Sequence, residues 1–173
     1  MTNKELYREF CKKNHQLPIF MQDWWLDAVC AGKEWDVMLC VKRGDEEMRL
    51  LGDEEMRRET EAPEEIVAAM PYLLRKRAWM QYILMPQQTQ IGGIWMSEDI
   101  TEDAEKVTAV CQQFARKLGE MGLSYYYQQY PIGSPAPQAM ETLGFKAKER
   151  VPYRIEDLSD LDNVIGRCSK NKK

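Results

Sequence analysis

The chain has 173 residues, about the length of one average domain. Hydrophobic residues make up 44% of the sequence and charged residues 30%, a composition typical of a globular protein and not of a disordered or fibrous one. The formal net charge of −4 argues against a general affinity for nucleic acid.

Several sequence features bear on cellular location. No stretch comes near the roughly 18 consecutive apolar residues of a membrane-spanning helix. The first residues, MTNKELYREFCKKNHQ, are charged throughout, unlike a secretory signal. The five cysteines are scattered and form no CxxC pair, so we expect neither a zinc site nor a redox dithiol. These features predict a cytoplasmic protein with no membrane span and no bound metal.

The first elements follow from residue spacing and turn residues. Helices are expected over 3–13 and 21–31, with the LPIF segment between them as an extended entry. Residues 35–42 (WDVMLCVK) are rich in β-formers and predict a strand.

A tandem repeat follows this strand. GDEEMRLL is followed directly by GDEEMRRE over residues 44–59. The repeat unit has eight residues, an even number. Equivalent residues of the two copies therefore fall on the same face of a strand but on different faces of a helix. We interpret residues 44–61 as an inserted hairpin or loop, acidic and outward-facing. A charge run of this kind is more typical of a solvated segment than of a binding site.

The rest of the chain predicts strands interleaved with helices. A strand is expected over 64–77, where Pro71 marks a bulge or an edge because proline cannot donate to a ladder. We expect Thr101 to cap the next helix and Gly122 to end it. The later segments are a strand, polar corner and extended continuation over 79–96, a helix over 101–121, a strand over 123–130, a short helix ending at Gly144 and a strand over 145–157. Such alternation predicts an α/β or α+β fold around one mixed sheet.

Familiar catalytic motifs are missing from the sequence. His15, the single histidine, stands in a polar stretch without a partner pattern, which argues against a Ser-His-Asp or Cys-His arrangement. No HExxH, GxGxxG or GxxxxGK[ST] motif occurs. We interpret the pair Gly92-Gly93 as a bend in an extended segment.

Glutamine and tyrosine side chains gather after two predicted strands. Strand alternation places Tyr126, Gln128 and Tyr130 on one face of YYYQQY and its other residues on the opposite face. Neutral amides and phenols hydrogen-bond sugars, peptides or amides without charge. The alternative is that these groups bond one another or the backbone, as buried polar groups normally do. The candidate binding residues are Gln87, Gln88, Gln90, Tyr126 and Gln128.

Six separate blocks of the sequence together resemble a known protein family. They are IFMQDWWLDAVC…WDVML, IVAAMPYLLRKR, YILMPQQTQIGGIW, LSYYYQQYP, LGFKAKERVPYRIEDLSDLD and SKNKK. In this order they resemble bacterial FemAB-like proteins, within the GNAT-like acyltransferase superfamily. The resemblance covers most of the chain and is interrupted by the acidic repeat. It implies a GNAT-like mixed, mostly antiparallel central sheet flanked by helices.

The resemblance also implies more than this chain contains, since FemAB-like proteins have two GNAT-like halves. Residues 1–157 resemble the first half, and residues 158–173, ending in CSKNKK, resemble the start of a linker helix to an absent second domain. For full-length relatives it implies an acyl-CoA or aminoacyl-tRNA donor and a cell-wall peptide precursor or other amine as acceptor. The donor-binding [QR]xxGx[GA] turn is missing here, so we expect no cofactor on this chain and assign no catalytic residue.

Two hypotheses from different classes follow. The chain is the N-terminal half of an acyl- or aminoacyl-transferase, inactive alone because its second half is missing. Alternatively, it is a stand-alone, non-catalytic binding module that uses the Gln/Tyr surface. In either case the face that a second domain would cover is expected to expose apolar area, through which copies of the chain can associate.

Overall fold

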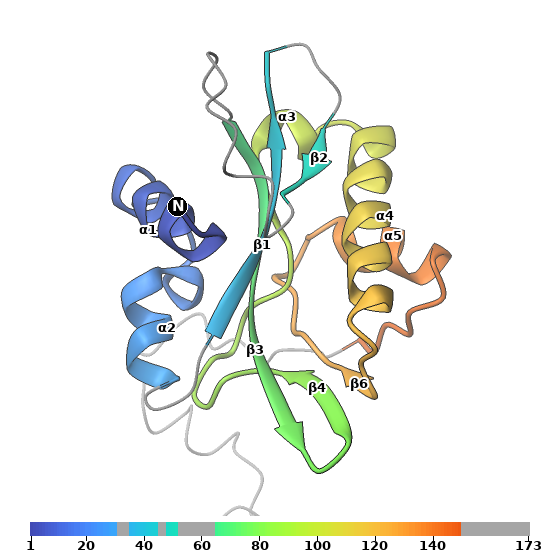
Figure 1. Cartoon of the computed structure of the whole chain (residues 1–173). Coiled ribbons are helices and arrows are strands. Elements are labelled where there is room, and N and C mark those ends of the chain that lie inside the picture. Colours follow the sequence, from blue (N-terminus) through green and yellow to red (C-terminus); the bar gives the residue numbers. More distant parts are fainter. Residues whose placement is uncertain (31–34, 45–47, 52–64, 150–173) are drawn as a thin grey trace, which may run out of the picture.

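The computed structural model describes residues 1–30, 35–44, 48–51 and 65–149. Short helices and strands alternate along this part of the chain (Figure 1). The elements are α1 (Asn3–Lys13), η1 (Ile19–Met21), α2 (Asp23–Val29), β1 (Trp35–Lys42), β2 (Arg49–Leu50), β3 (Glu65–Arg77), β4 (Met80–Leu84), β5 (Trp95–Met96), α3 (Glu98–Thr101), α4 (Ala104–Glu120), β6 (Tyr125–Tyr126) and α5 (Ala136–Thr142).

One sheet organises these elements. Its strand order is β2-β1-β3-β4-β6, and β5 pairs with β3 beside this path. All described pairs are antiparallel except β4 with β6, which is parallel. The predicted class, an α/β or α+β fold around a mixed and mostly antiparallel sheet flanked by helices, is therefore confirmed.

Helices cover both faces of the sheet. Figure 1 shows α1 and α2 on one side of β1 and β3, and α4 and α5 on the other. Along β1, Val37 and Leu39 pack into the core beneath α1 and α2, whereas Met38 and Cys40 pack into the core beneath α4 and α5. Because both faces are covered, β1 is apolar almost continuously and not in alternation.

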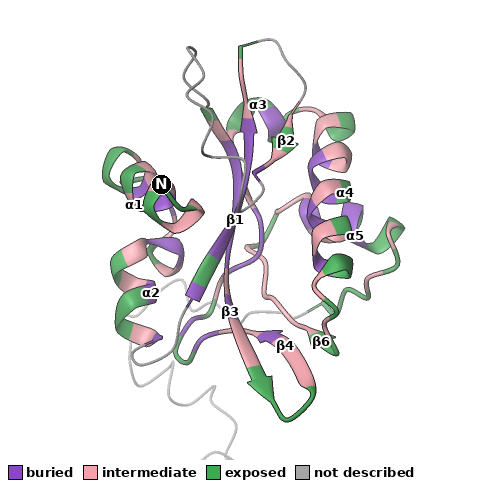
Figure 2. Cartoon of the chain, in the orientation of Figure 1, coloured by how far each residue is buried: buried purple, intermediate pink, exposed green. Residues whose placement is uncertain are grey.

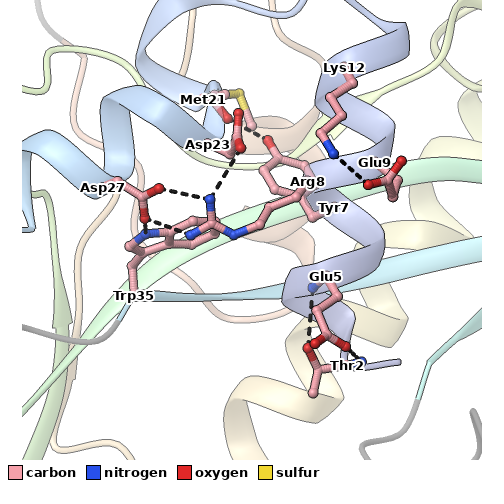
Figure 3. Close-up of polar contacts among 10 residues, drawn as sticks. All are labelled: Thr2, Glu5, Tyr7, Arg8, Glu9, Lys12, Met21, Asp23, Asp27 and Trp35. Atoms are coloured by element: carbon pink, nitrogen blue, oxygen red, sulfur yellow. Dashed lines mark hydrogen bonds and ion pairs between the residues drawn. The ribbon is translucent and has the colours of Figure 1, made fainter.

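Helix α1 has the predicted bounds, and hydrogen bonds fix its start and its position. Thr2 caps it in a capping box, since its hydroxyl accepts from the backbone N–H of Glu5 and the Glu5 carboxylate accepts from the N–H of Thr2. The buried Tyr7 hydroxyl donates to the backbone carbonyl of Met21 at 2.6 Å. This bond ties α1 to the turn that precedes α2 (Figure 3).

A charged network fixes α2 against α1 and β1. Arg8 makes two hydrogen bonds of 2.8 Å to the Asp27 carboxylate and one of 3.3 Å to Asp23. The Trp35 indole donates to Asp27 at 2.9 Å, and Lys4 lies 4.3 Å from the centroid of the Trp35 ring. As Figure 3 shows, the polar groups of α2 that face α1 are thereby paired. Met21 of η1 and Leu26 of α2 are buried, whereas Ile19 and Trp24 are exposed.

The helix predicted over 101–121 begins three residues later than predicted. Helix α3 ends at Thr101, and α4 begins at Ala104. The predicted cap at Thr101 is wrong: Asp103 caps α4, because its carboxylate accepts from the N–H groups of Glu105 and Lys106. The predicted end is confirmed, since Gly122 follows the last turn with φ +61°.

Other boundaries differ from the predictions. The LPIF segment runs into the 3-10 helix η1 instead of staying extended, and α2 is shorter than the predicted 21–31. The strand predicted over 123–130 is limited to β6. Residues 145–149 form no strand, and the rest of the strand predicted to residue 157, like the linker helix over 158–173, lies outside the described residues.

Pro71 stands inside β3 and not at an outer strand. It pairs in register with Val37 of β1, and the register shift between these strands lies elsewhere, at Cys40 and Val41. On the other edge of β3, β5 pairs with residues 68–69 and β4 begins pairing at Leu73. Pro71 thus falls where the described ladder on that edge is interrupted, which makes the missing N–H tolerable.

The first copy of the acidic repeat is better packed than predicted. Strand β2, within this copy, pairs antiparallel with β1. Leu51 is only 4% exposed, and Met48 and Leu50 pack against the core beneath α4. The outward-facing prediction is therefore wrong for Met48, Leu50 and Leu51, whereas Arg49 is exposed and the second copy lies outside the described residues.

Candidate functional site

The predicted glutamine and tyrosine residues divide into an inward group and an exposed group. Tyr126 points inward, where its hydroxyl lies 3.0 Å from that of Tyr130 and 3.5 Å from Met70 Sδ. On the opposite side of the segment, Gln129 Nε2 donates to the Tyr127 hydroxyl at 2.7 Å. These pairs confirm the predicted alternation of faces.

The Gln128 side chain also makes its hydrogen bond within the protein. Its Oε1 accepts from the backbone N–H of Gly93 at 3.2 Å, and its Nε2 is buried without a hydrogen bond. A Cβ at Gly92 would stand 2.5 Å from Gln128 Oε1, and one at Gly93 would stand 2.5 Å from Tyr130 Cδ1. The Gly-Gly pair is therefore more than a bend, since it admits the close approach of two segments. Tyr126 and Gln128 are half-buried, and the Tyr126 hydroxyl and Gln128 Oε1 make their hydrogen bonds within the protein.

The buried phenols do not provide a base. Burial raises the pKa of Tyr126 well above its ordinary value and that of Tyr130 to about 12. Both hydroxyls therefore stay protonated near neutral pH. The Tyr126–Tyr130 pair is a structural contact within one segment that packs against the core.

The thiols are equally unreactive. Burial raises the pKa of Cys40 to about 12 and the pKa values of Cys11 and Cys111 to about 11. Since the thiolate is the nucleophile, these cysteines act as small apolar residues.

The exposed group of glutamines lies on the loop after β4. Gln87, Gln88 and Gln90 are exposed, whereas Thr89 between them is only 8% exposed. The indole Nε1–H of Trp25 donates to Thr89 Oγ1 at 3.1 Å. This bond fastens the loop to α2 and leaves the flanking amides on the outside.

Aromatic and aliphatic side chains of η1 and α2 lie beside this loop. The Phe20 and Trp25 rings meet edge to face at 5.1 Å, and the Trp24 and Trp25 rings at 6.1 Å. Trp24 is 54% exposed and Ile19 is 51% exposed, high values for such large apolar side chains. We use the term aromatic–amide surface for Ile19, Phe20, Trp24, Trp25, Gln87, Gln88 and Gln90.

The interior beneath this surface is nearly full. A cavity of about 10 Å³ lies between η1, α2, the 85–92 segment and Gln128. Its lining includes Phe20, Pro71, Thr89 and Gly92. The volume corresponds to about one water molecule, so an organic ligand has to bind on the outside.

Elsewhere the described residues offer little chemistry. A shallow depression of about 400 Å³ lies along the outer side of α4, lined by Ala104, Glu105, Thr108, Ala109 and Gln112. The Thr108 hydroxyl already donates to the Ala104 carbonyl. Within the described ranges, no cluster of three or more His, Cys, Asp or Glu side chains is placed to hold a metal, and none of the helices is long and apolar enough to span a membrane.

Comparisons with known proteins leave the assignment open. No protein-family model, no curated protein and no solved structure matches the chain. The resemblance to FemAB-like and GNAT-like proteins therefore stays a prediction.

The sequence analysis identified the glutamines of this surface but not its aromatic and aliphatic residues. The aromatic residues of α2 were assigned only to a short helix, although the adjacent pair Trp24-Trp25 contained a signal. On a helix two consecutive residues point about 100° apart, so a narrow buried face seldom accommodates two neighbouring indoles. One of them is therefore expected on the surface.

Proposed function

We propose that this chain binds an uncharged peptide segment on its aromatic–amide surface and does not itself catalyse a reaction. Acyl or aminoacyl transfer, as in the FemAB-like proteins that the sequence resembles, would need a second domain. The chain then acts as the acceptor-binding half of a transferase, and the acceptor is a cell-wall peptide precursor or another amine-bearing peptide.

A single contact supports this proposal most strongly. The Trp25–Thr89 hydrogen bond joins α2 to the loop after β4 and keeps exposed indole and amide groups side by side. Exposed Trp24 and Ile19 are the kind of apolar anchors that interfaces use. Rigid attachment of the loop lowers the ordering that a ligand has to impose.

The chemistry of the surface selects the ligand. Each glutamine amide both donates and accepts, as a peptide unit does, so the loop complements a peptide backbone. Trp24 and Ile19 offer apolar contact to one side chain of that peptide. The charges of Asp23 and Asp27 on α2 are paired with Arg8 of α1. An uncharged ligand suits this composition better than an anion or a cation.

A non-catalytic role agrees with the titratable groups. The thiols and inward phenols described above stay protonated, because burial raises their pKa values. His15, the single histidine, is exposed on the turn after α1. No nucleophile within the described ranges has a histidine base beside it.

The location proposed for this binding is the cytoplasm. The four described cysteines are buried thiols and form no disulfide with one another. Thiols persist in reducing compartments.

Calorimetry of the full chain separates the binding role from catalysis. We expect no heat of binding with coenzyme A or acetyl-CoA, and weak binding of an acetylated, amidated alanine–leucine peptide. Trp24→Ala and the triple variant Gln87→Ala, Gln88→Ala and Gln90→Ala should each abolish the peptide signal. Ile132→Ala is the matched control, since Ile132 is 86% exposed but lies outside the aromatic–amide surface.

Micromolar binding of coenzyme A would overturn the non-catalytic role. Sedimentation of the free chain as a dimer that Trp24→Ala dissociates would instead make a second copy the occupant.

A further inference from the structure

We propose that the tip of the β3–β4 hairpin binds the surface of a membrane that contains anionic phospholipids. The hairpin tip consists of Arg75, Lys76, Arg77, Ala78 and Trp79. It lies apart from the aromatic–amide surface, so the inference does not depend on the proposed peptide binding.

The hairpin tip projects from the sheet. Arg77 of β3 pairs with Met80 of β4, so the turn between the strands has only two residues, Ala78 and Trp79. Figure 1 shows this end of the hairpin extending beyond the helices, and Figure 2 shows its exposed colour. Trp79 is 86% exposed. An indole this exposed at the apex of a turn has no packing role in the described fold.

The charge of the hairpin tip is opposite to that of the chain. Three consecutive cations stand in a protein with a formal net charge of −4. Lys76 and Arg77 are exposed, and none of the three makes an ion pair with a described residue. Exposed cations at a protruding end fit an anionic partner.

The shape of the hairpin tip favours a membrane over a nucleic acid. Strand alternation sends Arg75 and Arg77 to one face of the hairpin and Lys76 to the other. A nucleic acid strand lying on one face would contact only part of this charge. If the hairpin tip meets a planar membrane end-on, cations from both faces of the hairpin contact the membrane around the Trp79 indole. Tryptophan prefers the membrane–water interface, and basic residues are attracted to anionic headgroups.

The backbone of the turn determines where the indole lies. Ala78 has φ +51°, a left-handed conformation that glycine adopts more easily. A two-residue hairpin turn requires a positive φ at its first residue. Here that conformation holds Trp79 at the apex.

Co-sedimentation of the full chain with vesicles tests the inference. We expect binding to vesicles of phosphatidylcholine with phosphatidylserine and little binding to phosphatidylcholine alone. Arg75→Gln, Lys76→Gln and Arg77→Gln together should weaken binding by about 100-fold, since each cation near an anionic surface contributes about fivefold. Trp79→Ala should weaken it by about tenfold through lost apolar contact.

Matched variants keep this test specific. Lys12→Gln, Lys13→Gln and Arg116→Gln remove the same charge from exposed helical positions and should leave vesicle binding within about twofold of the wild type. Ile132→Ala removes an equally exposed apolar residue away from the hairpin tip and should have no effect. Circular dichroism confirms that each variant is folded. The inference is overturned by absence of binding to the anionic vesicles, by equal losses in the control set, or by binding of single-stranded DNA without binding of vesicles.

Discussion

The indole of Trp25 donates a hydrogen bond to Thr89 Oγ1 at 3.1 Å, across 64 positions of sequence. Thr89 is only 8% exposed, so its hydroxyl has little access to water. The bond joins the short helix α2 to the loop that presents the exposed glutamines. The aromatic–amide surface exists as one surface because of this contact.

Removing either partner should therefore destabilise the protein. We expect Trp25→Phe to lower the free energy of unfolding by about 1–2 kcal/mol, because Thr89 loses its donor in a site poor in water. A double-mutant cycle with Thr89→Val isolates the hydrogen bond from the lost indole area. Urea unfolding should give a coupling energy of about 0.5–1.5 kcal/mol. Strict additivity of the two changes would mean that the bond does not hold the loop.

Gly93 offers a test of the packing between the 91–93 and 128–130 segments. We expect Gly93→Ala to lower the free energy of unfolding by about 2–4 kcal/mol, because the new Cβ collides with the Tyr130 ring and the residue has a positive φ. Gly119→Ala is the matched control in α4, where a Cβ meets nothing within 4 Å. It should stabilise the chain by up to about 1 kcal/mol through helix propensity. Thermal unfolding of both variants measures the contrast, and similar melting temperatures would contradict the described packing.

The turn at Ala78 predicts a stabilising substitution. Ala78→Gly should raise the free energy of unfolding by about 0.5–1 kcal/mol, since glycine adopts the positive φ of this position without steric cost. The same change in α4, Ala109→Gly, should lower it by about 1 kcal/mol. Opposite shifts of the urea midpoint are expected. Destabilisation by both variants would show that Ala78 does not have a left-handed backbone in solution.

The Arg8–Asp27 contact predicts a pH effect. The Arg8 hydrogen bonds hold the pKa of Asp27 below its ordinary value. A carboxylate whose pKa is lower in the folded state stabilises the protein above its unfolded pKa, and this stabilisation is lost as pH falls through the folded pKa. Arg8→Gln should raise the Asp27 pKa toward the ordinary range and reduce that acid-sensitive loss of stability.

Carboxyl carbon NMR measures this shift directly. Glu5 is an internal control, because the backbone N–H of Thr2 lowers its pKa without help from Arg8. We expect Arg8→Gln to raise the pKa of Asp27 and to leave the pKa of Glu5 unchanged. An unchanged Asp27 pKa would mean that the ion pair is not formed in solution.

Local patterns explain which features were predictable. The alternation that joins Tyr126 to Tyr130 has a period of two residues, so the sequence alone predicts it. The cap of α4 was missed because Thr101 and Asp103 are both good caps in neighbouring positions. Burial of Ile100, only 1% exposed, fixes a separate turn at α3 and leaves Asp103 to begin the longer helix.

Contacts between distant segments could not be predicted in this way. No local pattern links Trp25 to Thr89, since their contact depends on where the loop after β4 meets α2. The inward use of Gln128 likewise depends on the close approach of Gly93. The candidate list therefore combined the exposed Gln87, Gln88 and Gln90 with the half-buried Tyr126 and Gln128, and it lacked the indoles that complete the surface.

The most direct test of peptide binding is a ¹⁵N NMR titration of the full chain with the acetylated, amidated alanine–leucine peptide. The five tryptophans give separate indole N–H signals, and the glutamine side chains give their own amide signals. We expect changes in the chemical shifts of the Trp24 indole N–H and of the Gln87, Gln88 and Gln90 side-chain amides. The Trp79 indole signal should stay unchanged. No shift in these signals at saturating peptide, or a response confined to Trp79, would contradict the proposed peptide binding.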